Sequence, residues 1–315
     1  MAIQLEYNEA IISGLKRVLI EQCKEALKYI QKADTDDKRH EAVHLTRKAF
    51  QKIRAGIRLV RDHMPSYGEV NVFFRDEGRK LSDIRDASAN LETLDKLEAQ
   101  YAEGFPDQSF DHFREMLLEY REELAKEVFR EDSGLIYMAQ DVEEQVPYIK
   151  EVDMDVNDFS DILPGIRKVY SRGRKAMKKA RSSGEEQYFH LWRKRAKYLR
   201  YQLDILRRIW PAVLSTLESE LHTLTDLAGM SHDLQVLRET LAKLDTETLE
   251  QPIGLHLQAL LDKHQEFVRT HALLLGERIY ELPPKAFCNL LEVYWKRYAE
   301  EIEQTGLPPL DQLKY

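Results

Sequence analysis

Two stretches of the chain place histidine, arginine and lysine at the spacing of one helix face. Residues 44–61 read HLTRKAFQKIRAGIRLVR, and residues 190–208 read HLWRKRAKYLRYQLDILRR. At about 100° per residue, the polar residues fall on one face and the apolar residues on the other. The polar faces comprise His44, Arg47, Lys48, Gln51, Arg54 and Arg58 in the first stretch, and His190, Arg193, Lys194, Lys197, Arg200 and Arg208 in the second.

These two basic stripes indicate an anion-binding surface. Like charges three or four residues apart on a helix repel by a few tenths of a kcal/mol per pair, so the stripes need anionic partners. Arginine offers a planar fork that matches phosphate oxygens, and lysine offers a mobile charge. Histidine adds a donor that becomes cationic near a pH of about 6.5, and a polyanion would raise its pKa. The alternative is that the acidic segment at 91–131 pairs with the stripes within the fold, so that no external anion is needed.

Two facing stripes would form a positive channel, which suits a long, repeating phosphate chain better than one small phosphate. DNA or RNA is the competing ligand. Proteins that bind single strands usually add aromatic residues on which the bases stack. Only Tyr201 lies near the stripes. The pattern therefore favours an anion without bases and leaves nucleic acid as an alternative.

A zinc-protease pattern overlaps the first stripe. Residues 40–44 read HEAVH, which satisfies H-E-x-x-H. A third ligand would have to come from His63 or Glu69, and Arg47 and Lys48 would oppose a dication one turn away. The second stretch lacks the motif, and we find no P-loop, dinucleotide-binding glycine motif or G-x-S-x-G. We therefore expect no metal site, no cofactor and no catalytic residues.

The chain shows signs of an internal duplication. The two stripes are offset by 146 residues, and Ser82-x-x-Arg85-Asp86 matches Gly229-x-x-His232-Asp233 at an offset of 147. A third match aligns residues 13–29 with 164–180. The motif aspartates either orient a basic side chain toward the ligand or form a buried polar pair between helices. The duplication predicts two halves, residues 1–150 and 151–315.

The distribution of charge matters more here than the net charge of −8. Residues 161–210 carry 15 Lys and Arg against 4 Asp and Glu, whereas residues 91–160 carry 6 against 20. One surface is therefore strongly positive on an anionic protein. No apolar run approaches the roughly 18 residues of a membrane span, the start lacks a secretory signal, and two cysteines fit a reducing cytoplasm.

Helix formers dominate, and no convincing strand pattern occurs, so the sequence predicts an all-α fold. We expect helices over the following ranges: 6–33, 44–61, 67–101 with a break near Gly78, 108–131, 164–180, 190–208, 224–241, 253–280 and 283–304. Residues 132–163 are acid-rich, contain Pro147 and lack a strong period. We interpret them as a linker between two helical bundles related by a pseudo-twofold axis.

The motifs resemble those of the CHAD family, the conserved histidine α-helical domain. Its duplicated pattern is close to H-x-L-R-x-x-x-[RK]-x-L-R, and its later motif is close to L-G-x-[LVI]-[RH]-D. The second stretch matches closely, with Trp192 in a leucine position, while Gln51 and Ile53 depart from the pattern in the first. Ser82 replaces the glycine of the later motif.

The resemblance implies two antiparallel four-helix bundles, binding of inorganic polyphosphate on a central basic surface, and association with polyphosphate granules in the cytoplasm. It implies a binding protein rather than an enzyme. The alternatives left open by the residues are a nucleic-acid binder and a polyphosphate-processing enzyme. The residues expected to bind polyphosphate are Arg17, Lys24, Lys28, His44, Arg47, Lys48, Arg54, Arg58 and Arg85 in the first half. In the second half they are Arg167, Arg174, Lys178, His190, Arg193, Lys194, Lys197, Arg200 and His232.

Overall fold

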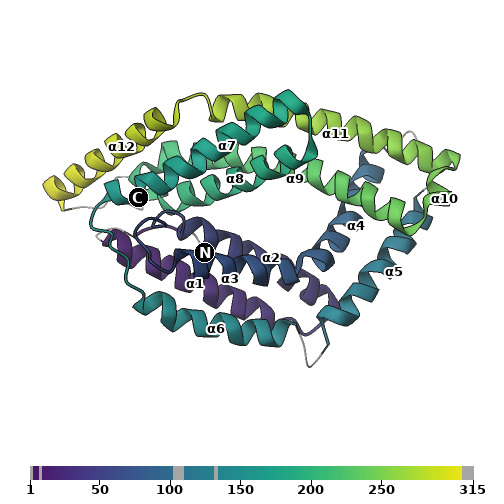
Figure 1. Cartoon of the computed structure of the whole chain (residues 1–315), viewed down its shortest axis with the longest axis horizontal. Helices are drawn as coiled ribbons and strands as arrows, with labels where there is room; N and C mark the ends of the chain where they lie inside the picture. The colour runs from purple at the N-terminus through teal and green to yellow at the C-terminus, as the bar shows by residue number, and fades with distance from the viewer. Residues whose placement is uncertain (1–2, 7–8, 102–109, 131–133, 307–315) are drawn as a thin grey trace.

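The computed structural model describes residues 3–6, 9–101, 110–130 and 134–306. Within these ranges every regular element is a helix and no strand occurs, so the all-α prediction is confirmed. The helices form an elongated molecule (Figure 1). None of the helices described is both long enough and apolar enough to cross a lipid bilayer.

The first half of the chain runs through α1 (Ile11–Gln31), α2 (Asp36–Gly56), α3 (Tyr67–Lys80), α4 (Ser82–Tyr101), α5 (Asp111–Val128) and α6 (Leu135–Glu151). The second half contains η2 (Phe159–Asp161), α7 (Leu163–Ser183), α8 (Glu186–Ile205), η3 (Arg207–Ile209), α9 (Pro211–Leu244), α10 (Thr246–Leu249), α11 (Pro252–Ile279) and α12 (Pro284–Thr305). The two basic stretches lie mainly on α2 and α8.

Local sequence signals fix several of the helix ends. Thr35 caps α2 by accepting a hydrogen bond from the Lys38 backbone nitrogen. Asp36 and Asp37 lie in the first turn, where their negative charge interacts favourably with the positive end of the helix dipole. The first turns of α7, α9, α11 and α12 contain proline, which needs no hydrogen-bond partner there. Gly184 ends α7 with a φ of 69°, a conformation that glycine adopts without steric cost.

The expectation of a linker over 132–163 is wrong for residues 135–151, which form α6 and pack against α1. Leu135, Met138, Val142 and Ile149 are buried at helical spacing. Glu143, Glu144 and Glu151 are exposed, so acidic residues alternate with the narrow apolar stripe and obscure its period in the sequence. Pro147 lies inside the helix without ending it.

The two halves of the chain pack directly against each other. Helix α2 contacts α8, and α4 contacts α9. Gln202 Nε2 donates to the carbonyl oxygen of Ala55 at 3.2 Å, and Asn90 Nδ2 donates to Thr240 Oγ1 at 3.0 Å. In the first half α1 pairs with α2 and α6, and in the second α7 pairs with α8 and α12. The duplication itself stays a prediction.

Two apolar cores hold the molecule together, and both contain residues from both halves. The larger core includes Leu19 and Phe50 together with Tyr170 and Trp192. The smaller core includes leucines and phenylalanines of α4, α5, α9 and α11. Burying one such side chain contributes about 1.5–3 kcal/mol. The shared cores fix α2 against α8, while the division at residue 150 stays a prediction.

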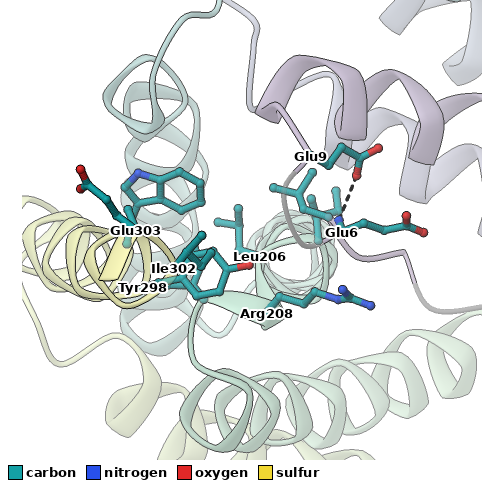
Figure 2. A pocket seen from close by; sticks show the side chains of 12 residues that line it. Glu6, Glu9, Leu206, Arg208, Tyr298, Ile302 and Glu303 are labelled. Carbon is teal, nitrogen blue, oxygen red and sulfur yellow. Dashed lines mark hydrogen bonds between the residues drawn. The ribbon is translucent and has the colours of Figure 1, made fainter. Parts of the chain in front are cut away.

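The segment before α1 lies against the end of α8, where the Leu5 backbone nitrogen donates to the Ile205 carbonyl oxygen at 3.0 Å. A cavity of about 230 Å³ lies beside this contact (Figure 2). Leu206 of the α8–η3 junction and Tyr298 and Ile302 of α12 line it. These apolar residues belong to the packing of α12 against η3, and the charged residues Glu6, Glu9, Arg208 and Glu303 also line the cavity.

Candidate anion-binding site

A cavity of about 640 Å³ lies between the two halves, where α2 and α8 pack together. Its cationic and histidine residues come from α2, α3, α4, α8 and α9. They are His44, Arg47, Lys48, Arg54, Arg75, Arg79, Arg85, His190, Arg193, Lys194, Lys197, Arg200, His222 and His232. The carboxylates that line it are Asp86, Asp226 and Asp233. Cations therefore greatly outnumber carboxylates in this space, which we call the central cavity.

On the side of the first half, hydrogen bonds position the basic side chains. Arg47 Nη1 donates to the Gly78 carbonyl oxygen at 2.5 Å and to Ser82 Oγ at 2.7 Å. The Arg85 Nε donates to His44 Nδ1 at 3.1 Å. The α3–α4 junction thus fixes the α2 guanidinium, and α4 contributes a second guanidinium beside the histidine.

On the side of the second half, Arg200 Nε donates to Glu218 Oε1 at 2.7 Å. Arg193 lies 4.0 Å from an oxygen of Asp233, the motif aspartate. The rings of His190 and His232 lie 5.0 Å apart, so the two motif histidines meet in the cavity.

Other cations of the cavity are not neutralised by acidic side chains. Among the described residues, no carboxylate forms an ion pair with Lys48, Lys194 or Lys197. Within the acidic segment at 91–131, Glu92 pairs with the lining residue Arg85. An external anion would therefore find lysines without a carboxylate partner in the lining of the cavity.

Burial and neighbouring cations lower the pKa of three histidines that line the cavity, His44, His190 and His232. Desolvation by burial, together with Arg85, lowers the pKa of His44 to about 4. Burial and Arg193 lower the pKa of His232 to about 3, and burial lowers that of His190. The expectation that these histidines become cationic near pH 6.5 therefore needs correction. His44 and His232 are therefore neutral at pH 7 unless a bound anion raises their pKa.

Two lysines of α8 are also perturbed. Burial lowers the pKa of Lys197 to about 7, with Arg193 adding to the effect and Asp233 opposing it. Burial, together with Arg54, lowers the pKa of Lys194 to about 8. Both lysines therefore titrate in the neutral range, and a bound polyanion would favour their charged forms.

The motif aspartates lie in the same cavity. Burial raises the pKa of Asp86, Arg47 lowers it, and Asp233 raises it further. The two aspartates, one from each half, therefore interact across the cavity. This placement is consistent with both of their expected roles, orienting a basic side chain and joining two helices.

The aromatic residues of the cavity are poorly placed for base stacking. Phe50, Phe74, Tyr198 and Tyr201 line it, yet each is at most 4% exposed. Tyr198 is covered by the Arg58 guanidinium, which lies 4.0 Å from the centre of the ring. Among the lining residues, no aromatic ring is free to stack on a nucleobase.

Most of the residues expected from the sequence lie together in the central cavity, and the others lie elsewhere. The residues brought together are His44, Arg47, Lys48, Arg54, Arg85, His190, Arg193, Lys194, Lys197, Arg200 and His232. The residues placed outside the cavity lining are Arg17, Lys24, Lys28, Arg58, Arg167, Arg174 and Lys178.

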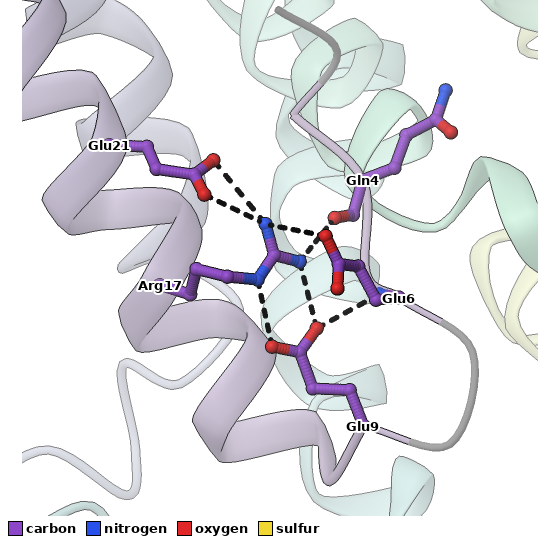
Figure 3. Close-up of polar contacts among 5 residues, drawn as sticks. All are labelled: Gln4, Glu6, Glu9, Arg17 and Glu21. Atoms are coloured by element: carbon purple, nitrogen blue, oxygen red, sulfur yellow. Dashed lines mark hydrogen bonds and ion pairs between the residues drawn. The ribbon is translucent and has the colours of Figure 1, made fainter.

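Arg17 holds the N-terminal segment against α1 (Figure 3). Its guanidinium donates to both carboxylate oxygens of Glu9 at 2.8 Å, to Glu21 at 3.1 Å and to the Gln4 carbonyl oxygen at 2.8 Å. Glu6 lies 3.7 Å away. These partners occupy the guanidinium, so the structure gives Arg17 a packing role in place of the expected ligand contact.

The other outlying residues have different surroundings. Arg174 Nε donates to the Tyr280 carbonyl oxygen at 2.9 Å, and Lys28 lies 3.7 Å from Glu25. Lys24 and Lys178 are exposed. Arg58 is buried behind the cavity wall, and Arg167 lines a different cavity, between α7 and α12.

Sequence reasoning missed Arg75 and Arg79 of α3, which line the central cavity. They stand four residues apart, so they share a helix face. Asp76 forms ion pairs with both arginines. In the sequence, this mixture of acidic and basic residues is typical of a solvent-exposed helix face, so it gave no sign of a binding site. His222 of α9 was also missed, because nothing in its neighbourhood repeats a motif.

The zinc-protease pattern does not assemble into a ligand set in the structure. His40 Nδ1 lies 3.1 Å from Ser88 Oγ, and His44 is engaged by Arg85. Across the described residues, no three His, Cys, Asp or Glu side chains gather as a metal site would require. Cys23 and Cys288 are both buried.

The fold and the site define an all-helical protein with a cationic cavity between its two halves. The sequence profile of the CHAD domain matches residues 19–242, and the chain therefore belongs to the CHAD family. The matched range contains both basic stripes and both aspartate motifs.

A similar solved structure is the crystal structure of the CHAD domain from the plant Ricinus communis. The two chains share 14% sequence identity over 93% of this chain and 95% of the other, with a TM-score of 0.49. A search of curated proteins finds no match.

Proposed function

We propose that this protein binds inorganic polyphosphate in the central cavity. CHAD domains are associated with polyphosphate binding. The single observation that carries the proposal is the convergence of unpaired cations from both halves, Lys48 on α2 and Lys194 and Lys197 on α8, in one cavity. Anion binding would relieve the repulsion among these charges.

The composition of the cavity favours a phosphate chain over a nucleic acid. Arginine forks and lysines bind phosphoryl oxygens, and the neutral histidines donate hydrogen bonds. The lining aromatics are buried, so bases would gain little stacking energy there. A nucleic acid is the second candidate, because the same cations would bind its backbone.

We propose binding without catalysis, because arginine, lysine and neutral histidine groups suffice to hold a phosphate chain. The proposed cellular setting is the cytoplasm, at polyphosphate granules. The alternative of a polyphosphate-processing enzyme predicts release of orthophosphate from the bound chain. Incubation of the protein with polyphosphate and divalent cations, followed by a phosphate assay, tests that alternative directly.

The binding test reverses the charge of one unpaired lysine from each half. The variant Lys48→Glu/Lys194→Glu removes two charged contacts, each worth about 1.5–3 kcal/mol, so affinity for long-chain polyphosphate should fall at least about 100-fold. Both lysines are half-buried, and the described residues offer them no carboxylate partner whose loss would disturb folding.

The matched control is Lys32→Glu/Lys179→Glu, which makes the same change of charge at two exposed lysines outside the cavity. It should retain wild-type affinity. Circular dichroism checks that both variants keep their helices. Equal affinity of the Lys48/Lys194 variant and the wild type would refute the central cavity as the binding site.

A further inference from the structure

A second group of cations lies away from the central cavity, in a cavity of about 530 Å³ between α7 and α12. Its five basic residues are Arg167, Lys168, Arg172, Lys175 and Lys285. None of the residues lining it also lines the central cavity. We call it the α7–α12 cavity.

The arrangement follows from helical spacing. Lys168, Arg172 and Lys175 recur at intervals of four and three residues, so they share one face of α7, and Arg167 lies beside that face in the cavity lining. Lys285 faces them from the first turn of α12. Neutral polar groups, including the Ser171 hydroxyl and the Asn289 amide, add hydrogen-bonding capacity to the lining.

The positive charge of this cavity is uncompensated. The lining contains no aspartate or glutamate, and among the described residues none of its five cations forms an ion pair. The nearby aspartates belong to η2. Asp161 Oδ2 accepts the Asn157 and Asp158 backbone nitrogens at 2.8 and 2.9 Å, and Asp158 caps the turn. These carboxylates stabilise backbone groups and leave the cations unpaired.

We propose that the α7–α12 cavity is a second anion-binding site that takes a short linear oligophosphate, independently of the central cavity. An oligophosphate carries several negative charges on linked phosphoryl groups, which matches five cations distributed over two helices. Arginine and lysine supply the donors that phosphoryl oxygens accept. The first turns of α7 and α12 add the partial positive charge of two helix N-termini.

The phosphoryl groups could belong to a free oligophosphate or to an exposed part of a long polyphosphate chain. Both sources have the same chemistry. If the ligand is part of a long chain, changing this cavity lowers the affinity for long-chain polyphosphate; if it is a free oligophosphate, that affinity does not change. The experiment therefore measures tripolyphosphate and long-chain polyphosphate separately.

The experiment titrates tripolyphosphate into the full chain by calorimetry, with the central cavity disabled by Lys48→Glu/Lys194→Glu. This background should still bind one tripolyphosphate. Adding Lys175→Glu/Lys285→Glu should weaken that binding at least about tenfold, because two exposed charged contacts are reversed. Adding Lys32→Glu/Lys96→Glu instead makes the same charge change at exposed lysines away from the cavity and should leave the binding unchanged.

Absence of tripolyphosphate binding in the Lys48/Lys194 background would overturn the second site. Equal binding with and without Lys175→Glu/Lys285→Glu would overturn it as well. Circular dichroism checks folding, and the neutral pair Lys175→Ala/Lys285→Ala serves as a milder variant with the same expected direction. If the proposed function is wrong instead, the Lys48→Glu/Lys194→Glu variant binds long-chain polyphosphate as tightly as the wild type.

The long-chain measurement assigns the source. A lower long-chain affinity of Lys175→Glu/Lys285→Glu in the otherwise wild-type chain identifies the ligand as an exposed part of a bound polyphosphate. An unchanged long-chain affinity, with tripolyphosphate binding weakened, identifies it as a free oligophosphate.

Discussion

The perturbed lysines of the central cavity predict that polyphosphate affinity falls steeply as the pH rises from 7 to 9. Burial lowers the pKa of Lys197 to about 7 and that of Lys194 to about 8. A polyanion binds the protonated lysines, so the bound state holds protons that the free protein has partly lost. Binding therefore takes up protons, and affinity is highest below the pKa of the free lysine.

The magnitude follows from the fraction of each lysine that is protonated in the free protein. Between pH 7 and pH 9 this fraction falls about 50-fold for Lys197 and about tenfold for Lys194, if both return in the complex to the ordinary lysine pKa of about 10.4. The two effects together lower affinity by up to about 500-fold. His44 and His232 stay neutral across this range and add little to the pH dependence.

The assay is fluorescence anisotropy of labelled long-chain polyphosphate at constant ionic strength. Lys197→Arg keeps a permanent charge and should remove the contribution of Lys197 to the pH dependence. Lys197→Met removes the charge, so it should bind more weakly than the wild type at both pH values, and the difference in affinity should narrow by up to about 50-fold between pH 7 and pH 9. A wild-type affinity that does not change between pH 7 and 9 would refute this reasoning.

Three further outcomes are expected. Raising the salt from about 50 to about 200 mM should lower polyphosphate affinity by about 10³–10⁵ if 6–10 phosphates are contacted, by analogy with DNA, whereas a flat response would contradict multiple charge contacts. Gly165→Ala should lower the free energy of unfolding by about 1–3 kcal/mol, because its Cβ would meet the carbonyl oxygens of Arg58 and Leu59, and Gly68→Ala, with open space around it, is the control for denaturant unfolding. Arg17→Met should lower the thermal midpoint while long-chain affinity, measured by anisotropy, stays at the wild-type value; a large loss of affinity would place Arg17 in the site.

The sequence predicted the all-α class and the residues of α2 and α8 that meet in the cavity. Helical periodicity alone assigns His44, Arg47 and Lys48 to one face, because the spacing along a helix is fixed by its geometry. The helix break expected near Gly78 occurs at Leu81, between α3 and α4. These predictions depend on local geometry, which the order of residues encodes directly.

Other features depend on tertiary contacts and could not be read from the sequence. Arg17 and Arg174 belong to basic helix segments and were therefore expected to bind the ligand. Only the fold brings them their partners, Glu9 for Arg17 and the Tyr280 carbonyl oxygen for Arg174. The lowered pKa values of His44 and Lys197 require burial. Helix α6 was missed because its acidic outer face concealed a narrow apolar stripe.

The most direct test of the central claim is a competition titration at about 0.15 M salt, where surface charges are screened within about 8 Å. Labelled long-chain polyphosphate bound to the wild-type protein is challenged with unlabelled polyphosphate, single-stranded DNA, RNA, pyrophosphate and ATP. We predict that unlabelled polyphosphate displaces the probe efficiently and that the nucleic acids displace it poorly. Equal displacement by nucleic acid at the same phosphate concentration would contradict a dedicated polyphosphate site.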